Sequence, residues 1–227
     1  MPGPDDILIA GASALGIRLR PEQVDAFRAY RQEILRWSAR MNLTGLRNPE
    51  DIVRAGFLDS LACLSLIPSE ARRALDVGSG AGFPALPLKL ARTDLSFTLV
   101  EASRKKASFL CHMVRSLRLA GVRVVPERVE ALAGDPREVG AYDLALARAV
   151  APPHEQGRLV QAFLRPGGLF LVQLGPGRMP DETLNRLRAL QLEPVGERAL
   201  PREIGRPGRR VLALRRTREG AGADCFT

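Results

Sequence analysis

The residues with the clearest chemical potential lie in a glycine-rich turn, GSGAGFP at residues 78–84, directly after the apolar run ALDV at residues 74–77. Leu86, Leu88 and Leu90 follow the turn and suggest a helix with Pro84 in its first turn. Glycine lets the backbone approach a ligand without a Cβ in the way, and a helix N-terminus offers unpaired N–H groups. Strand, glycine turn and helix in this order predict a site for a nucleoside-containing ligand. A tight turn with no ligand is the alternative.

An acidic residue closes the next predicted strand. Glu101 ends the run SFTLVE at residues 96–101, about twenty residues beyond the glycine turn, where a carboxylate can accept hydrogen bonds from two ribose hydroxyls. By itself Glu101 could equally be an exposed carboxylate at a strand end. Because Glu101 follows the glycine turn in the sequence, we favour a ribose-binding role for it.

The pattern favours S-adenosylmethionine (SAM) over a nicotinamide dinucleotide. The spacing is G-x-G-x-G, whereas the dinucleotide fingerprint is G-x-G-x-x-G, whose third glycine would fall at Phe83. Asp76 precedes the turn, and an acidic strand end suits the cationic methionine part of SAM better than a pyrophosphate. The segment LRPGG at residues 164–168 also resembles the helix-to-strand turn of many SAM methyltransferases.

Such a site needs a sheet to position it, and the sequence from Arg73 onward supplies the pattern. Short apolar runs alternate with helical segments, at residues 74–77, 96–101, 122–126, 142–147 and 169–174. This predicts an α/β fold with a mostly parallel sheet covered on both faces. A helix near residues 181–190 and a last apolar run at 211–214 follow.

The first 66 residues have a helical pattern instead. Apolar residues from Val24 to Trp37 recur at spacings of three and four after Pro21, and a second helical run covers residues 52–64 beyond a loop at 41–49. We therefore expect an N-terminal helical extension over residues 1–66 and a catalytic domain over 67–218. Residues 219–227 are rich in glycine and alanine, and we expect a disordered tail there.

Composition points to a polyanionic partner and away from membranes and metals. The net charge is +9, which favours nucleic acid because each phosphate contact releases counterions. All but three of the 34 basic residues are arginine, however, a bias that GC-rich coding can also produce. No apolar stretch approaches the roughly 20 residues needed to cross a bilayer, and the first residues lack the positive charge of a secretory signal, so we expect a soluble cytoplasmic protein. The three widely spaced cysteines lack the pairing of a zinc site, and we expect reduced thiols and no metal.

Several blocks, in order along nearly the whole chain, resemble the ribosomal small-subunit methyltransferase G family, also called glucose-inhibited division protein B. The blocks are Asn42-Leu43-Thr44, Phe57-Leu58-Asp59-Ser60, residues 76–84, Arg104-Lys105-Lys106, Arg128-Val129-Glu130 and Ala147-Arg148-Ala149-Val150. The resemblance implies transfer of a methyl group from SAM to N7 of a guanine in the 530 loop of bacterial 16S ribosomal RNA. It also implies a Rossmann-like class I fold with seven strands, the last of them antiparallel near residues 210–214.

The resemblance further implies roles for individual residues. Those at the cofactor would be Asp76, Gly78, Ser79, Gly80, Gly82, Phe83, Glu101, Ala102, Val129, Glu130 and Arg148. Val129 and Glu130 would lie beside the adenine, while Arg148 and Asn42 would act at the methyl-transfer centre. Arg104, Lys105 and Arg128 would contact RNA. Surface charge or salt bridging is the alternative for each arginine.

The sequence departs from the family pattern at positions near the expected RNA face. Ala55-Gly56 stands where a basic residue and a histidine usually precede the F-x-D-S block, and Leu174 replaces a lysine before Gly175. Ala85 replaces a glycine, and Arg209-Arg210 replaces an Arg-His pair. We expect the two histidines, His112 and His154, to have no catalytic role.

Three functions therefore stay open. The chain could be an active guanine-N7 methyltransferase of 16S ribosomal RNA, and we expect a monomer because no coiled-coil pattern is present. It could instead be a methyltransferase that acts on another RNA or a smaller acceptor. It could also be a SAM- or RNA-binding protein without enzymatic activity. Transfer to 30S subunits and to no other acceptor would exclude the second function, and any turnover would exclude the third.

Overall fold

The computed structural model describes residues 2–148, 151–201, 204 and 208–217. Its N-terminal part is helical, with α1 (Pro4–Ala14), α2 (Pro21–Ser38), α3 (Pro49–Asp51), the π-helical segment η1 (Ile52–Leu58), α4 (Asp59–Leu61) and the 3-10 segment η2 (Ala62–Leu66). The predicted tail at 219–227, and Ala149 and Val150 of the last motif block, lie outside the described residues. No helix in the described ranges is both long and apolar enough to cross a bilayer.

Strands and helices alternate after η2. The strands are β1 (Arg73–Val77), β2 (Ser96–Val100), β3 (Val122–Val125), β4 (Tyr142–Ala147), β5 (Leu164–Leu174), β6 (Leu192–Ala199) and β7 (Arg210–Arg216). The helices between them are α5 (Ala85–Ala91), α6 (Arg104–Ser116), α7 (Val129–Leu132), α8 (Pro153–Val160) and α9 (Asp181–Ala189). The helix that the leucines predict after Pro84 is thus confirmed as α5.

The seven strands form one sheet in the order β3-β2-β1-β4-β5-β7-β6. Strands β1 to β5 pair in parallel, while β7 runs antiparallel to both of its neighbours. The expected α/β fold with an antiparallel last strand is confirmed. The strand order reverses between β1 and β4, and ligands of open α/β sheets bind at the carboxyl ends of the strands beside such a reversal.

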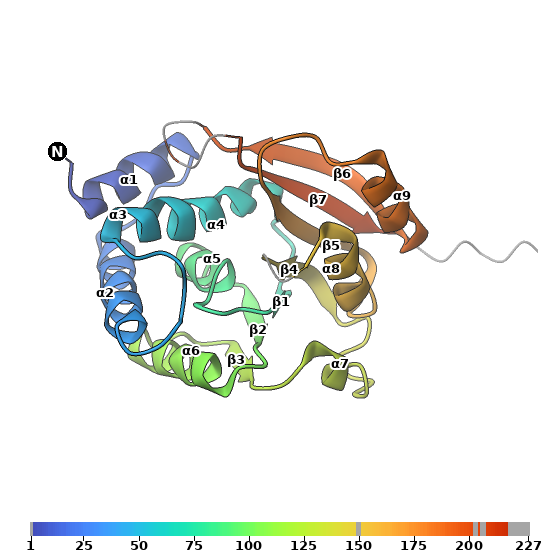
Figure 1. Cartoon of the computed structure of the whole chain (residues 1–227), viewed down its shortest axis with the longest axis horizontal. Coiled ribbons are helices and arrows are strands. Elements are labelled where there is room, and N and C mark those ends of the chain that lie inside the picture. The colour runs from blue at the N-terminus through green and yellow to red at the C-terminus, as the bar shows by residue number, and fades with distance from the viewer. Residues whose placement is uncertain (1, 149–150, 202–203, 205–207, 218–227) are drawn as a thin grey trace, which may run out of the picture.

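Side chains alternate between two buried faces along each central strand. Ala74, Leu99 and Leu144 belong to the core that includes the N-terminal helices, α5 and α6. Leu75 and Ala145 belong to the second core, together with residues of α7, α8 and α9. The sheet therefore lies between two helical layers. Figure 1 shows α1, α4, β6 and β7 along the upper edge of the molecule and α2 along the left edge.

Strand β6 is the element that the apolar runs do not predict. Its sequence, LEPVGERA, contains a proline and alternates between half-buried and exposed residues after Leu192. It lies at the edge of the sheet and pairs with β7 alone, with an irregularity between Pro194 and Gly196. Proline is tolerated there because an edge strand leaves one side of its backbone unpaired.

Candidate active site

A cavity of about 840 Å³ lies at the carboxyl ends of the central strands. Its wall comes from the turn after β1, the end of β2, the segment after β3, the residue after β4 and the N-terminal loop at residues 43–46. Sites for small molecules and cofactors usually measure roughly 300–1,000 Å³. The cavity therefore has the size and the place in the sheet that a nucleoside-containing ligand requires.

The glycine turn forms the floor of this cavity. Gly78 and Gly80 have φ angles of +70° and +56°, which L side chains rarely adopt. The N–H groups of Gly78 and Ser79 donate to the carbonyl oxygen of Val100, at 2.9 Å and 3.2 Å, which ties the turn to β2. A Cβ on Gly80 would meet only the Gly78 carbonyl oxygen, at 3.7 Å. The space beside Gly80 is therefore free for a ligand.

Glu101 is fixed against this turn by two charge-assisted hydrogen bonds. Its Oε2 accepts from the N–H of Gly80 and its Oε1 from the N–H of Ser103, both at 2.8 Å. The residue is 8% exposed, and it lines the cavity. A carboxylate has about four lone-pair sites, so both oxygens keep acceptor capacity for hydroxyl groups. This arrangement suits the ribose of SAM.

Asp76 lies beneath the turn and does not line the cavity. Its carboxyl group is fully buried. Burial raises the pKa of Asp76 to about 8, although the Ser79 hydroxyl and the Ala85 backbone amide oppose the shift. A raised pKa favours the neutral form of an isolated carboxyl group, whereas a cationic ligand group nearby would favour the ionised form. The role of Asp76 at the cationic end of SAM stays a prediction.

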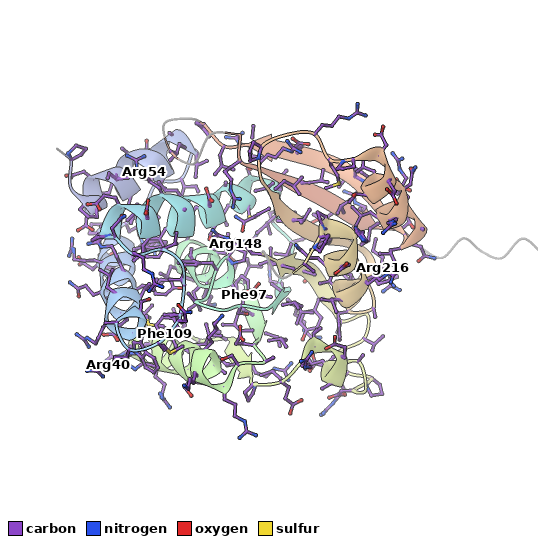
Figure 2. The ribbon with its side chains drawn as sticks, viewed as in Figure 1. Arg40, Arg54, Phe97, Phe109, Arg148 and Arg216 are labelled. Atoms are coloured by element: carbon purple, nitrogen blue, oxygen red, sulfur yellow. The ribbon has the colours of Figure 1, made fainter. Side chains whose placement is uncertain are left out.

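Arg148 follows β4 and is anchored over the cavity. Figure 2 shows it near the middle of the molecule. Its Nη2 donates to the carbonyl oxygen of Ala55 at 2.5 Å, and its guanidinium carbon lies 5.5 Å from the centre of the Phe83 ring. Burial lowers the pKa of Arg148, and the Asp59 carboxylate opposes this effect. Arginine nonetheless stays protonated in proteins, so a positive charge faces the cavity.

The structure brings most of the sequence-predicted residues together. Those that line the cavity are Gly78, Ser79, Gly80, Phe83, Glu101, Ala102, Arg128, Val129, Glu130 and Arg148. Gly82 faces the helical layer instead, because a Cβ there would lie 2.4 Å from the Tyr30 hydroxyl. Asn42 is exposed and accepts from Arg47, and Arg104 and Lys105 are exposed on α6 outside the cavity.

The cavity also contains residues that sequence reasoning missed. The main additions are Leu43, Thr44, Gly45, Leu46, Lys106, Glu127 and Leu159. The Asn42-Leu43-Thr44 block was a usable signal for the loop, but it singled out the asparagine rather than the residues after it. Lys106 lines the wall and the predicted Lys105 does not, because the side chains of consecutive helical residues point about 100° apart.

Phe83 explains how the fold accommodates the unusual glycine at position 56. A Cβ on Gly56 would lie 2.7 Å from the Phe83 ring. The ring therefore occupies the space that a larger side chain would need. Neither histidine in the described part of the chain lines the cavity. His112 contacts Glu33 at 2.9 Å, and His154 lies 3.2 Å from Arg186.

Comparison with known proteins identifies the family. The model of the GidB family, rRNA small subunit methyltransferase G, matches residues 23–201. Two proteins named ribosomal RNA small subunit methyltransferase G illustrate the similarity. That of Roseiflexus castenholzii is 43% identical over 173 residues, which cover 75% of this chain and 73% of its own. That of Chloroflexus aggregans is 39% identical over 233 residues, covering 91% and 97%.

Solved structures share the fold at low sequence identity. A SAM-dependent methyltransferase from Aquifex aeolicus has a TM-score of 0.55 at 13% identity and covers 75% of this chain and 94% of its own. The TYW2 protein of M. jannaschii, in complex with AdoMet, has a TM-score of 0.53 at 16% identity, covering 67% and 72%. These matches, together with the seven-stranded sheet, show the fold. The family model and the relatives show that the chain belongs to the rRNA small subunit methyltransferase G family of SAM-dependent enzymes.

Proposed function

We propose that this methyltransferase transfers the methyl group of SAM to N7 of a guanine in the 530 loop of 16S ribosomal RNA. The observation that carries the proposal is a nucleoside-sized cavity at the reversal of the sheet, in a chain of this family. The net charge of +9 supports an RNA substrate. We further propose that the protein acts as a monomer in the cytoplasm, where ribosomal subunits are found.

The cavity wall suggests how SAM is held. Gly78, Ser79 and Gly80 would let the ligand approach the backbone, and Glu101 would accept hydrogen bonds from its ribose hydroxyls. Val129, which is 5% exposed, and Glu130 follow β3 at the opposite wall and would flank the adenine. SAM supplies an electrophilic methyl group on a sulfonium sulfur.

The acceptor atom determines what the protein must do. Guanine N7 carries no proton and presents a lone pair in the plane of the base, so no general base has to deprotonate it. Catalysis then depends on alignment, which can lower a barrier by roughly 7–11 kcal/mol, and on fixed dipoles that match the moving charge. Arg148, anchored by Ala55 and stacked near Phe83, is the positioned charged group at the place where the base must enter.

Cationic residues around the opening would contact the RNA backbone. Arg128 and Lys106 line the cavity, and Arg104 and Lys105 are exposed beside them at the start of α6. Phosphate contacts of this kind fix orientation and carry no sequence information. Asn42 is exposed in the loop that contributes residues 43–46 to the cavity wall, so it would meet RNA at the rim.

The test is methyl transfer from isotopically labelled SAM to 30S subunits from a strain that lacks the native methyltransferase, followed by mapping of the modified base. Label on N7 of the 530-loop guanine is the expected result. Label on another base or another RNA would contradict the proposed target. An absence of label, with SAM binding confirmed by calorimetry, would contradict the proposed activity on this subunit.

A further inference from the structure

A groove of about 490 Å³ lies between helix α6 and the C-terminal end of α2 with the residues that follow it, and it shares no residue with the cofactor cavity. The side chains that matter below are Trp37, Arg40, Met41, Lys105 and His112. Figure 2 shows Arg40 at the lower left of the molecule, whereas Arg148 lies near the middle. The volume is within the range of small-ligand sites, so the groove can hold a group as large as a nucleobase.

Two aromatic rings form part of the groove wall. The ring centres of Trp37 and His112 lie 5.5 Å apart, and the Trp37 ring also packs edge-on against that of Phe109, 5.5 Å away. Phe109 is fully buried, so it fixes the indole in place. Trp37 is half-buried and the His112 side chain is 34% exposed, so both can be reached from the groove. Accessible rings that core packing holds in position are platforms on which nucleobases stack.

Two cations beside these rings have no partner. The side chains of Arg40 and Lys105 are exposed, and neither forms an ion pair or hydrogen bond with the part of the chain that the structure describes. The acidic residue of the groove is already paired, because Glu33 accepts from Nη1 of Arg36 at 2.8 Å and lies 2.9 Å from Nε2 of His112. The groove therefore combines an aromatic wall with a net positive charge.

The groove and the cofactor cavity adjoin along the chain on both sides. Lys105 lines the groove and the next residue, Lys106, lines the cavity. Met41 likewise lines the groove, and Leu43 lines the cavity two residues later. An RNA strand whose target base enters the cavity would therefore pass the two lysines and reach the groove.

We propose that this groove binds an unpaired nucleotide of the substrate RNA other than the target guanine; this inference rests on the proposed function. Its base would stack on Trp37, and Arg40 and Lys105 would contact the neighbouring phosphates. An unpaired base can be splayed out of the strand in this way, whereas a base inside a helix is covered by its neighbours. Every base has a π face, so the groove adds affinity and tolerates any base.

Trp37 is the only tryptophan of the chain, so the intrinsic fluorescence of the full protein reports on this groove. The probes are a short single-stranded oligouridylate and an abasic oligonucleotide with the same number of phosphates, and the anisotropy of a dye on each probe measures binding. Stacking of a base on an indole quenches the fluorescence. The oligouridylate should bind at low salt and quench Trp37, whereas the abasic probe should bind more weakly and leave the fluorescence unchanged.

Three results with the wild-type protein would overturn the proposal. Binding of the oligouridylate without quenching would mean that RNA binds elsewhere on the protein. Equal quenching by the two probes would mean that phosphates alone occupy the groove. An absence of oligouridylate binding at low salt would mean that the groove has no affinity for single-stranded RNA.

Variants then locate the contacts. Trp37→Leu keeps an apolar side chain against Phe109 and should weaken oligouridylate binding roughly 5–100-fold. Trp37→Phe retains a smaller ring and should lie between this variant and the wild type. Arg40→Ala should weaken binding of both probes and reduce the slope of log K against log salt by about 0.7, the value for one phosphate of a single strand. Arg20→Ala removes an exposed charge at the other end of α2 and should behave as wild type.

Methyl transfer to 30S subunits separates this inference from the proposed function. Trp37→Leu should raise KM for the subunit, with kcat and SAM affinity close to the wild-type values, because Trp37 lies outside the cofactor cavity. If the wild type methylates the subunit but oligouridylate does not quench Trp37, the function stands and the RNA groove is wrong. If oligouridylate quenches Trp37 but no methyl group is transferred, the proposed function fails and the RNA groove is supported.

A protein component of the subunit is the other possible occupant. A raised KM of Trp37→Leu, without quenching of the wild type by oligouridylate, would favour that occupant and overturn the RNA groove. A folding defect in Trp37→Leu would be visible as a lowered melting temperature. The two probe measurements on the wild type and the salt dependence of Arg40→Ala would then decide.

Discussion

The hydroxyl group of Tyr30 donates a hydrogen bond to the carbonyl oxygen of Ala81, 2.5 Å away. Tyr30 lies on α2, and Ala81 lies in the middle of the glycine turn. The tyrosine is fully buried and its ring centre lies 5.9 Å from that of Phe83. Helix α2 therefore stabilises the glycine turn of the proposed cofactor site. A change in α2 should be detectable as a change in SAM binding.

Tyr30→Phe tests this support. The substitution leaves the Ala81 carbonyl without its hydroxyl partner, so the free energy of unfolding should fall by about 1–3 kcal/mol. SAM affinity should weaken as well, because the turn loses an anchor. Tyr142→Phe is the control, since this hydroxyl bonds Glu138 and Thr98 away from the cavity. Urea unfolding measures the loss of stability, and calorimetry measures SAM affinity. Equal SAM affinities for the two variants would contradict a supporting role of Tyr30 at the turn.

Gly80→Asp should abolish SAM binding. The free space beside Gly80 would hold a charged side chain, and a non-glycine residue at a φ of +56° adds strain. Gly140→Asp is matched in backbone conformation, with a φ of +62° and nothing within 4 Å of a Cβ. That control should lose some stability and keep its SAM affinity in calorimetry. Similar affinities for both variants would argue against the site.

Glu101→Gln should weaken SAM binding roughly 10–100-fold, since hydrogen bonds to charged groups contribute about 1.5–3 kcal/mol. An amide has a single acceptor oxygen, so either Gly80 or Ser103 would face its NH₂ group. Glu127→Gln is the control. It removes a negative charge from the same cavity wall, and Glu127 does not contact the turn. A similar loss in both variants would mean that net charge, rather than the position of Glu101, determines affinity.

Arg148→Ala should leave SAM affinity within about threefold of wild type and slow methyl transfer by roughly 100-fold or more, as expected for loss of a positioned charge. The physical reason is that Arg148 lines the cavity just after β4, where under the proposed function the base would meet the methyl group. Arg20→Ala removes an exposed positive charge outside the cavity and is the control for charge. Equal transfer rates for the wild type and Arg148→Ala at saturating substrate would contradict the role of Arg148 in methyl transfer.

Asp76 predicts a pH effect on stability. Its carboxyl group has a pKa of about 8 in the folded protein, against an ordinary value of 3.8. The unfolded chain therefore releases this proton at a lower pH than the folded protein does. The stability that depends on this group is fully present below about pH 4 and is lost as the pH rises toward 8. Relative to wild type, Asp76→Asn should gain up to about 1.4 kcal/mol per pH unit across that window.

Asp143→Asn should change the pH dependence of stability in the opposite direction. Burial alone would raise the pKa of Asp143, but the backbone N–H groups of Arg73 and Arg72 and the Arg165 side chain lower it overall. Its contribution is present above the unfolded pKa and is lost as the pH falls through the folded one. Urea unfolding of all three proteins from pH 3 to pH 8 would measure both effects. Parallel curves for the wild type and Asp76→Asn would show that Asp76 ionises normally.

The sequence by itself determined the order of strands and helices and the position of the cofactor turn. Apolar periodicity and glycine placement are local properties, so β1, the turn at residues 78–84 and α5 follow from neighbouring residues alone. The resemblance added the antiparallel last strand, which β7 confirms. The apolar runs did not predict β6, because this edge strand buries few side chains and its apolar pattern is weak.

The tertiary structure alone decided which residues share a cavity. Packing places the loop at residues 43–46 opposite the glycine turn, and helix rotation turns Lys106 rather than Lys105 toward the ligand space. Burial likewise raises the pKa of Asp76. A smaller cavity, of about 350 Å³, is lined by Asp59, Gln156 and Gln173 from elements far apart in the chain. Such contacts depend on how several elements pack together, and no local pattern in the sequence encodes them.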